Sequence, residues 1–377
     1  MKNIAINATL MTPQAGGIGE YMKQLISGIE KLPYEQQPFI FINQKIKSEY
    51  KFKRAANLVS LSLPASPGLR LAVENILWRY LVYRYNLGIF HSPISYIAPG
   101  VTIPSIVTIH DLRYFHYPET YTRLRGKYLQ KAIPSSLQKA RKIIAISEYT
   151  KKDIICTFNT DPDKITVIHQ GIAKERFNIK IPHLIKEQLK KEYKLPENFI
   201  LSVGHLEPRK NHKCLLQAMR IFMDTNSYPI NLVVTGKENW YFKEIYDRVD
   251  ELDLKKYVHF TGFVKDSDLP CFYQMAQLVI SPSLFEGFGF TPLEAMAAGT
   301  PVIVSNCTSH PEICGEAAEY FNPHDPQELS EKIEGLLSDS TKRKTLMQKG
   351  YENINRFSWD TCCRRTLNVY QDLLSTL

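Results

Sequence analysis

The stretch that most restricts the fold is residues 278–305, LVISPSLFEGFGFTPLEAMAAGTPVIVS, which predicts a strand, a loop, a helix and a second strand. Its two ends are short apolar runs, as in strands that are buried on both faces. We expect Thr291 to be the N-cap of the helix, Glu294 to be its third residue and Gly299 to end it. This unit favours a parallel sheet covered by helices.

The same alternation of strand and helix runs along the chain, and 377 residues are long for one hydrophobic core. We therefore expect an α/β protein with two doubly wound, Rossmann-like domains that face each other across a cleft, with the ligand at the carboxyl ends of the strands. The expected parts are an N-terminal domain at 1–172, a linker and first helix at 173–195, a second domain at 196–356 and a C-terminal helix at 357–377.

The apolar runs place the individual strands. In the first domain the expected strands are Ile4–Asn7, Phe39–Asn43, Leu58–Leu61, Ile89–His91, Ile106–Ile109, Ile143–Ile146 and Ile165–Ile168. In the second domain they are Phe199–Val203, Ile230–Val234, Val258–Phe260, Leu278–Ile280, Val302–Val304 and Ala318–Phe321.

Composition narrows the class of protein. Apolar residues make up 44% of the chain and charged residues 23%, as in ordinary globular proteins. The formal net charge of +9 favours anionic partners such as nucleotides, phospholipid surfaces or nucleic acid. Seven cysteines without CxxC spacing argue against a disulfide framework and a zinc site, and indicate a reducing compartment. Since we find no signal peptide and no membrane-spanning apolar run, we expect a cytoplasmic protein.

The loop before the helix of the 278–305 stretch has the features of a ligand site. Gly287 and Gly289 allow left-handed backbone angles and a close approach of a ligand, and the free N–H groups of the helix start attract anions. Glu286 and Glu294 flank that site. Because ionised carboxylates only accept hydrogen bonds, they fit a ligand rich in hydroxyl groups, such as ribose or a hexose. Alternatively, Glu294 completes a capping box and Glu286 is a solvated loop residue.

Loops after two strands of the first domain also carry candidate residues. Gly16 and Gly17 open a helix, where backbone N–H groups can bind phosphate or a sugar, or form only a tight turn. His110 follows the strand at 106–109 and can donate a hydrogen bond to a reacting sugar or phosphate, or be a core histidine. Asp111 can orient His110 or bind an acceptor.

The loop after the first strand of the second domain begins at Gly204 and contains Arg209 and Lys210. Arginine can form a forked contact with phosphate oxygens, and lysine adds a compact point charge. We therefore interpret this loop as a phosphate-binding loop, and a solvated basic turn is the alternative.

The loop after the strand at 258–260 is the last candidate contact. The backbone of Gly262, Phe263 and Val264 can contact the edge of a nucleobase. The Asp-Ser-Asp triplet at 266–268 lies where a helix is expected to begin, so we interpret it as a helix cap. We predict no metal site and no cofactor.

Two segments, 68–87 and 121–142, combine basic, apolar and aromatic residues. The first contains Trp78, Tyr80, Tyr83 and Tyr85, and the basic residues of the second are Arg123, Arg125, Lys127, Lys131, Lys139, Arg141 and Lys142. Such segments can lie on an anionic membrane surface, or they can be helices with a solvated basic face and a packed apolar one. Both interpretations stay open.

In their order along the chain, several motifs resemble those of the large retaining glycosyltransferase family 4, whose members have two Rossmann-like domains of the GT-B type. The motifs are GGIGEY, IHDLRYFHYPE, ISEYTKKDI, VIHQGI, VGHLEPRKN, FTGFV and SPSLFEGFGFTPLEAMAAGTPVI. They extend over almost the whole chain, and the last block is the most specific. The resemblance implies an acceptor-binding first domain, a donor-binding second domain and a C-terminal helix that crosses back to the first domain.

The resemblance also implies roles for single residues. Glu286 is expected to contact hydroxyl groups of the donor sugar, and Glu294 the ribose. Arg209 and Lys210 are expected to bind the donor diphosphate, although several family members carry this arginine where the present chain has His205. The expected catalytic residues are His110, Glu286, Arg209 and Lys210. The other expected donor-binding residues are Gly16, Gly17, Gly204, Gly262, Phe263, Val264, Gly287, Phe288, Gly289, Phe290 and Thr291, and the expected acceptor-binding residues are Asp111, Arg113 and Tyr114.

The implied reaction is the transfer of a hexose or deoxyhexose, such as mannose or rhamnose, from a nucleotide diphosphate sugar to a glycan or lipid-linked acceptor in surface polysaccharide synthesis. Charge-assisted hydrogen bonds and a helix terminus can stabilise the leaving diphosphate without a metal ion. No carboxylate stands out as a nucleophile, so we expect same-face attack by the acceptor with retention of configuration. We expect no nucleic acid partner; an anionic surface on the inner face of the cytoplasmic membrane is a further possible partner.

Two other functions stay open at this point. Sugar-nucleotide epimerases and phosphorylases share the fold, although we identify no pyridoxal-binding lysine that a phosphorylase would need. The other alternative is a non-enzymatic basic module that binds nucleotides or nucleic acid. The base of the donor, guanine or uracil, is also open.

Overall fold

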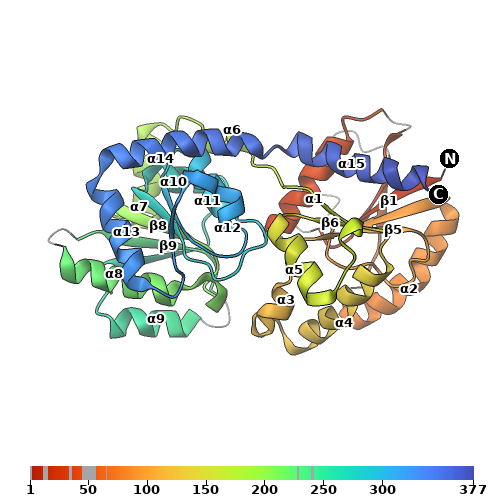
Figure 1. Cartoon of the computed structure of the whole chain (residues 1–377), viewed down its shortest axis with the longest axis horizontal. Helices are drawn as coiled ribbons and strands as arrows, with labels where there is room; N and C mark the ends of the chain where they lie inside the picture. The colour runs from red at the N-terminus through yellow and green to blue at the C-terminus, as the bar shows by residue number, and fades with distance from the viewer. Residues whose placement is uncertain are drawn as a thin grey trace. The chain divides into compact units, whose positions relative to one another are not determined.

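The computed structural model describes residues 2–11, 16–33, 36–44, 57–64, 66–226, 229–238 and 242–377. The chain divides into two compact units (Figure 1). Unit 1 consists of Met1–Gly171 with Phe357–Leu377, and unit 2 is Ile172–Arg356. Each unit is built on one parallel sheet with helices, so the predicted α/β class with two Rossmann-like sheets is confirmed.

The sheet of unit 1 has the order β3-β2-β1-β4-β5-β6-β7, and its described neighbours all pair in parallel. Its strands are β1 (Asn3–Ala8), β2 (Phe39–Asn43), β3 (Leu58–Leu61), β4 (Leu87–Ser92), β5 (Ser105–Ile109), β6 (Lys142–Ala145) and β7 (Ile165–Val167). The apolar runs of the sequence predicted every one of these strands to within two residues.

The helices of unit 1 cover both faces of its sheet (Figure 1). They are α1 (Gly16–Ile29), α2 (Pro67–Arg84), α3 (Arg113–His116), α4 (Arg123–Lys139), α5 (Glu148–Phe158) and α15 (Trp359–Ser375), with 3-10 turns at Pro118–Thr120 and Pro162–Lys164. Alternate residues of a strand face opposite sides. Ile6 of β1 packs with α1 and α15, whereas Ala5 faces the side that α2 covers.

The C-terminal helix α15 belongs to unit 1 although it follows unit 2 in sequence. Its buried residues Cys362, Val369 and Tyr370 lie in the same core cluster as Met22 and Leu25 of α1. Ser358 caps this helix by accepting a hydrogen bond from the backbone N–H of Thr361, at 3.4 Å. The chain end therefore completes the hydrophobic core of the first sheet.

The sheet of unit 2 has the order β10-β9-β8-β11-β12-β13 and is also parallel. Its strands are β8 (Phe199–Val203), β9 (Asn231–Thr235), β10 (Val258–Gly262), β11 (Leu278–Ser281), β12 (Val302–Ser305) and β13 (Glu319–Phe321). Strand β8 lies in the middle of the sheet, where Leu201 is in register with Val233 of β9 and with Val279 of β11.

The helices of unit 2 are α6 (Lys174–Phe177), α7 (His183–Tyr193), α8 (His212–Thr225), α9 (Phe242–Glu251), α10 (Leu269–Met275), α11 (Phe290–Ala297), α12 (His310–Cys314), α13 (Pro326–Ser338) and α14 (Ser340–Asn353), with 3-10 turns at Pro208–Lys210, Gly315–Ala317 and Ile354–Arg356. One face of the sheet packs on α8, α9 and α13. Helices α10 and α11 contact each other and the central strands.

The start of α11 differs from the prediction. Thr291 is the second residue of this helix rather than its N-cap, because Gly289, at a φ of +102°, takes the cap position. Glu294 is then the fifth helical residue, too far along to complete a capping box. The predicted end is confirmed, since α11 stops at Ala297 and Gly299 follows with a φ of +78°.

The Asp-Ser-Asp triplet lies at the start of a helix, as predicted, but it does not make the capping hydrogen bond that was expected. Asp268 is the N-cap residue of α10, but its side chain makes no capping hydrogen bond. Its carboxylate instead accepts hydrogen bonds from Ser267 Oγ at 2.8 Å and from Tyr193 Oη at 3.0 Å.

All seven cysteines are free thiols. Within the described ranges, no helix is long and apolar enough to cross a membrane.

Candidate functional site

The topology of unit 2 brings two loops together at the carboxyl edge of its sheet. Strands β8 and β11 are neighbours in the sheet but not in sequence, so the connections from them run to opposite sides. Doubly wound sheets bind their ligands at such a switch point. The loops that follow these two strands, 204–211 and 282–289, contain the predicted residues Arg209, Lys210 and Glu286.

Arg209 lies in the 3-10 turn Pro208–Lys210 and is buried, with 7% of its surface exposed. The carboxylate of Glu207, which is also buried, accepts hydrogen bonds from Arg209 Nη2 at 2.6 Å and from Arg209 Nε at 3.0 Å. Buried charges persist when they are paired in this way. Glu207 therefore fixes the guanidinium in one orientation. Glu207 was not predicted as a site residue.

Glu286 joins the two loops. Its Oε2 lies 2.8 Å from Arg209 Nη1, and its Oε1 accepts a hydrogen bond from Lys210 Nζ at 2.7 Å. Burial alone would raise the pKa of Glu286, but the charges of Arg209 and Lys210 outweigh it and hold the pKa well below its usual range. Glu286 is therefore ionised at neutral pH. Its position between two cations rules out the alternative of a solvated loop residue.

Gly204 makes room for the lysine of this cluster. A Cβ atom at Gly204 would lie 2.9 Å from Lys210 Cε and 3.1 Å from Lys210 Cδ. The Lys210 side chain therefore lies against the backbone at the end of β8, and a larger residue at position 204 would displace it. The backbone N–H of Gly204 donates to Thr235 O at 2.9 Å, so the loop after β8 also contacts the end of β9.

The loop before α11 is held by two hydroxyl groups from the loop after β12. Ser309 Oγ donates to Glu286 O and Phe288 O, both at 2.9 Å. Thr308 Oγ1 accepts a hydrogen bond from the backbone N–H of Glu286 at 3.2 Å. Gly287–Phe290 thus form a fixed turn that leads into the N-terminus of α11, where anions are favoured.

His310 packs under this turn and was not predicted as a site residue. It is fully buried, and its Nδ1 lies 2.9 Å from Ser305 Oγ. A Cβ at Gly289 would lie 3.2 Å from the imidazole ring. Burial lowers the pKa of His310 to about 4. A lone histidine before a proline carries no sequence signal for this position, because the contact depends on how β12 and the turn before α11 pack.

Apart from Gly16 and Gly17, the other residues predicted to bind the donor lie on the same unit. Glu294 accepts a hydrogen bond from Tyr273 Oη at 2.7 Å. Gly262 ends β10 with a φ of +68°, and its carbonyl accepts a hydrogen bond from the N–H of Gly236. Phe263 is exposed, with Lys237 Nζ 4.8 Å from the centre of its ring, whereas the Val264 side chain is buried. The side chain of Phe263 can therefore contact a ligand, and Val264 can do so only through its backbone.

His110 lies in unit 1, at the carboxyl end of β5, and is buried. Its Nε2 is 2.8 Å from Pro93 O, and its Nδ1 is 3.2 Å from the Gln170 side-chain nitrogen. Because a carbonyl only accepts hydrogen bonds, Nε2 carries the hydrogen and Nδ1 accepts from Gln170. Burial lowers the pKa of His110, so the ring is neutral. A bond from the ring to a sugar would have to replace one of these contacts.

The residues predicted to bind the acceptor follow His110 directly. Asp111 accepts a hydrogen bond from the backbone N–H of Arg113 at 3.0 Å. Arg113 donates from Nε to Tyr121 Oη at 3.0 Å and stacks over the same ring. Tyr114 is only 2% exposed and belongs to the core under α4, so a contact with an acceptor would have to come from its backbone. Its position follows from packing of α3 on the sheet.

Gly16 and Gly17 form the exposed start of α1. Gly16 has a φ of +55°, and a Cβ there would meet no atom within 4 Å. The predicted helix start with glycines is therefore present.

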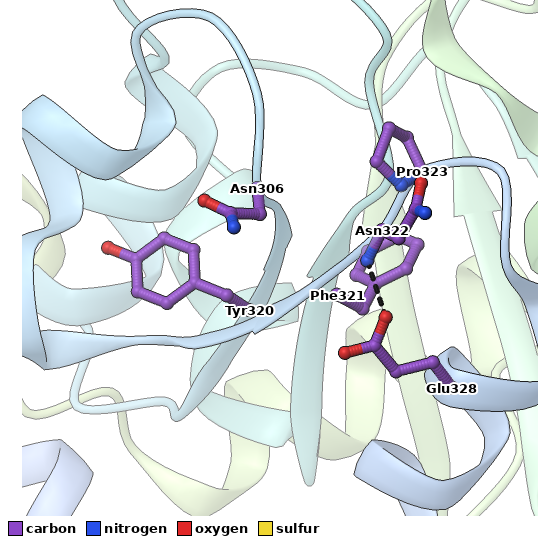
Figure 2. A pocket seen from close by; sticks show the side chains of 6 residues that line it. All are labelled: Asn306, Tyr320, Phe321, Asn322, Pro323 and Glu328. Carbon is purple, nitrogen blue, oxygen red and sulfur yellow. Dashed lines mark hydrogen bonds between the residues drawn. The ribbon is translucent and has the colours of Figure 1, made fainter.

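A pocket of about 420 Å³ lies at the carboxyl edge of the same sheet, and Figure 2 shows the side chains that line it. Its lining residues come from the ends of β12 and β13 and from α13, and they are Asn306, Tyr320, Phe321, Asn322, Pro323 and Glu328. Glu328 accepts a hydrogen bond from the backbone N–H of Asn322 at 2.8 Å. The carbonyl of Pro323 accepts a hydrogen bond from Asn211 at 2.7 Å, which connects the pocket wall to the loop of Arg209.

Comparison with known proteins agrees with this architecture. Residues 15–176 match the family model described as Glycosyltransferase Family 4, and residues 185–353 match the model described as Glycosyl transferases group 1. The chain is 33% identical to O-antigen chain mannosyltransferase B of Escherichia coli, over 76% of this chain and 75% of that protein. It is 31% identical to O-antigen chain mannosyltransferase RfbU of Salmonella typhimurium, over 64% of this chain and 65% of that protein.

Among solved structures, sucrose-phosphate synthase from Thermosynechococcus elongatus superimposes with a TM-score of 0.78 at 19% identity, over the full length of both chains. The two Rossmann-like sheets define a fold of the GT-B type. The chain belongs to the family 4 glycosyltransferases, and it is a glycosyltransferase.

Proposed function

We propose that the chain transfers mannose, or a closely related hexose or deoxyhexose, from a nucleotide diphosphate sugar to a glycan or lipid-linked acceptor in the synthesis of a surface polysaccharide. The names of two relatives, both O-antigen chain mannosyltransferases, support this choice of sugar and pathway. The observation that carries the proposal is the contact of Arg209 and Lys210 with Glu286 at the switch point of unit 2.

The cluster suits a diphosphate because its cations can exchange partners. Lys210 contacts Glu286 through a single hydrogen bond, so an incoming phosphate oxygen can replace that carboxylate. Arg209 is held on its other side by Glu207 and keeps its orientation during the exchange. The N–H groups at the start of α11 add further partial positive charge. The diphosphate would then contact both cations and the turn Gly287–Thr291.

Glu286 acquires its role in this exchange. Once Lys210 turns to the phosphate, Glu286 Oε1 is free to accept hydrogen bonds, and a carboxylate can only accept. Hydroxyl groups of a sugar attached to the diphosphate are the matching donors of hydrogen bonds. We assign Glu294 to the ribose on the same ground, with Tyr273 holding the Glu294 carboxylate in place.

Breaking the bond between the sugar and the diphosphate places additional negative charge on the leaving group. Charge-assisted hydrogen bonds contribute roughly 1.5–3 kcal/mol each, and preorganised groups of this kind are often the largest catalytic term. We therefore propose that transfer needs neither a metal ion nor a cofactor. The acceptor would attack from the face that the diphosphate leaves, which retains the configuration, and His110 would act near the sugar through its backbone or ring.

We place this reaction at the inner face of the cytoplasmic membrane, where lipid-linked acceptors are available. The test of the proposal is the release of nucleoside diphosphate from a panel of sugar nucleotides, beginning with GDP-mannose, in EDTA and with or without an O-antigen oligosaccharide. A transferase releases the nucleotide only when the acceptor is present. Equal release without acceptor would instead indicate a hydrolase or an epimerase that hydrolyses its donor, and a new sugar nucleotide formed without release would indicate an epimerase that only isomerises it.

A further inference from the structure

Helix α2 of unit 1 exposes a row of large apolar and aromatic side chains. Leu69 is 58% exposed, Ile76 is 75%, Tyr80 is 57% and Tyr83 is 89%. These residues are spaced by seven, four and three positions, and such spacings fall on one side of a helix. The row therefore runs along the length of α2 as a single stripe.

The opposite side of α2 is fully packed. Trp78 has no exposed surface, and its ring makes edge contacts with Phe41 at 5.0 Å and Phe90 at 4.8 Å. Leu81 is buried in the same cluster. The exposed stripe is thus distinct from the core cluster, which contains none of its four side chains.

Positive charge borders the stripe on both sides. Arg79 and Arg84 are exposed and lie roughly 60° to one side and roughly 80° to the other side of Ile76 around the helix. The one acidic residue of α2, Glu74, is 4% exposed and bound to Arg70 at 2.8 Å. The exposed side of α2 therefore carries cations and no carboxylate.

Helix α4 packs on the same face of the sheet as α2 (Figure 1). Burial, together with the nearby charge of Glu74 of α2, raises the pKa of Tyr128 of α4 to about 12, while the charge of Arg70 lowers it. Leu124 is 84% exposed, and α4 contains no acidic residue. Its exposed cations are Arg123, Arg125, Lys127, Lys131 and Lys139.

We infer that α2 and α4 form a docking surface for a lipid bilayer that contains anionic lipids. Aliphatic side chains that enter the bilayer, tyrosines at its interface and flanking arginines are the features of helices that lie in a membrane surface. A nucleic acid would account for the cations but not for the exposed Leu69 and Ile76. The inference goes beyond the proposed transfer reaction, because lipid binding needs neither donor nor acceptor.

The test is cosedimentation of the full chain with vesicles of phosphatidylcholine alone and with vesicles of phosphatidylcholine and phosphatidylglycerol in equal parts. We expect binding to the anionic vesicles, weakening with salt. Arg79→Gln with Arg84→Gln should lower this binding about 30-fold, from roughly 1 kcal/mol for each basic residue near the surface. Ile76→Ser with Tyr83→Ser should also lower binding to the anionic vesicles. The loss caused by this apolar pair should not depend on salt, whereas the loss caused by the arginine pair should.

Matched controls test whether the position of the charged and apolar residues on α2 matters, or only their loss from the chain. Arg364→Gln with Arg365→Gln removes the same charge from the exposed side of α15, on the other face of the same unit, and should bind as the unchanged protein does. Leu184→Ser removes a leucine that is 68% exposed in unit 2, and should also leave binding unchanged. All these positions are exposed, so the variants should keep the thermal unfolding midpoint of the unchanged chain.

Several results would overturn the inference. They are no binding to anionic vesicles, equal losses in the α2 and α15 variants, and tighter binding of the α2 surface to RNA than to vesicles. The unchanged chain could also form dimers that dissociate in the Ile76→Ser and Tyr83→Ser variant. That result would show that the stripe binds a second copy of the chain instead of a membrane. Because transfer to a soluble oligosaccharide is measured separately, a failure here would leave the proposed reaction untouched.

Discussion

Lys210 Nζ lies 2.7 Å from Glu286 Oε1, and this contact joins the ends of two neighbouring strands across 76 residues of sequence. Arg209 binds the second oxygen of the same carboxylate, and Glu207 binds Arg209 in turn. Two cations and two carboxylates therefore balance one another at the switch point. An anion that enters must compete with Glu286 for the two cations. Replacing a member of the cluster should therefore change nucleotide affinity, stability or transfer in a way that depends on the residue.

Replacing Lys210 should weaken binding of a nucleoside diphosphate. Lys210→Ala removes one charge-assisted hydrogen bond, at roughly 1.5–3 kcal/mol, so affinity should fall about 10- to 100-fold in calorimetric titration. Lys213→Ala is the matched control, because Lys213 is exposed in the next turn and pairs with Glu244. Equal affinity of the Lys210 variant and the unchanged chain would remove Lys210 from the diphosphate site.

Replacing Glu286 should change both stability and its pH dependence. A group whose pKa is depressed by folding contributes stability above its unfolded pKa, about 4.3 for glutamate, and that contribution is lost as the pH falls toward its folded pKa. Glu286→Gln should therefore be roughly 1–3 kcal/mol less stable at neutral pH in urea unfolding. The difference should shrink below about pH 4. A difference that is constant with pH would contradict the assignment of an ionised Glu286.

Glu286→Gln should also separate binding from transfer. The variant loses the carboxylate that competes for Lys210, so it should bind a free nucleoside diphosphate at least as tightly as the unchanged chain. It should lose transfer, because the acceptor of sugar hydroxyl hydrogen bonds is weakened. Parallel losses of nucleotide affinity and transfer would instead show that Glu286 serves the phosphates alone.

His310 should make the native state sensitive to mild acid. Its pKa is lowered to about 4 by burial, so the folded protein binds this proton less readily than the unfolded chain, whose histidine titrates near 6.5. The stability that depends on neutral His310 is complete above about pH 6.5 and is lost as the pH falls toward about 4. Over this pH window, His310→Gln should lower the slope of the free energy of unfolding against pH by the equivalent of up to one proton taken up on unfolding. His212, also buried with its pKa lowered to about 4, would keep its own contribution.

Gln170 should set the protonation of His110. The Gln170 amide donates to His110 Nδ1, which keeps the ring neutral, whereas a carboxylate at that position would accept a hydrogen from Nδ1 and stabilise the charged ring. In Gln170→Glu the acid limb of the pH–rate profile of transfer should therefore move to higher pH. Gln170→Asn, with a shorter amide, should lower the rate without moving the limb. Identical profiles in all three proteins would show that the contact is structural only.

Tyr114 should tolerate loss of its hydroxyl. Among the described residues, its buried Oη has no hydrogen-bond partner, and such a group carries a desolvation cost. Tyr114→Phe should leave stability unchanged or raise it by up to about 1 kcal/mol. The KM for the acceptor should not change. A large rise in that KM would show that the Tyr114 hydroxyl serves acceptor binding.

The sequence was a good guide to the sheets and a weaker one to the contacts between loops. Apolar runs predicted the strands because burial on both faces requires them. Sequence spacing also predicted that Arg209, Lys210 and Glu286 follow strand ends, but not that their charges pair. That pairing depends on the order of β8 and β11 in the sheet.

The errors have local physical causes. The N-cap of α11 was misplaced because Gly289 adopts a left-handed angle and lets the helix begin one residue before Thr291. The burial of the Tyr114 side chain was not predicted, because it arises from the four-residue helix α3, which turns this side chain into the core. His310 gave no sequence signal, since its place under the turn at Gly289 arises only in the folded unit.

The measurement that tests the central claim most directly is analysis of the acceptor after incubation with a sugar nucleotide in EDTA, by mass spectrometry and by NMR of the anomeric carbon. We predict that an O-antigen oligosaccharide gains one hexose with the configuration of the donor, and that Lys210→Ala abolishes most of this gain. An unchanged acceptor with every sugar nucleotide, or a gain that disappears in EDTA, would contradict the account of metal-independent transfer at Arg209, Lys210 and Glu286.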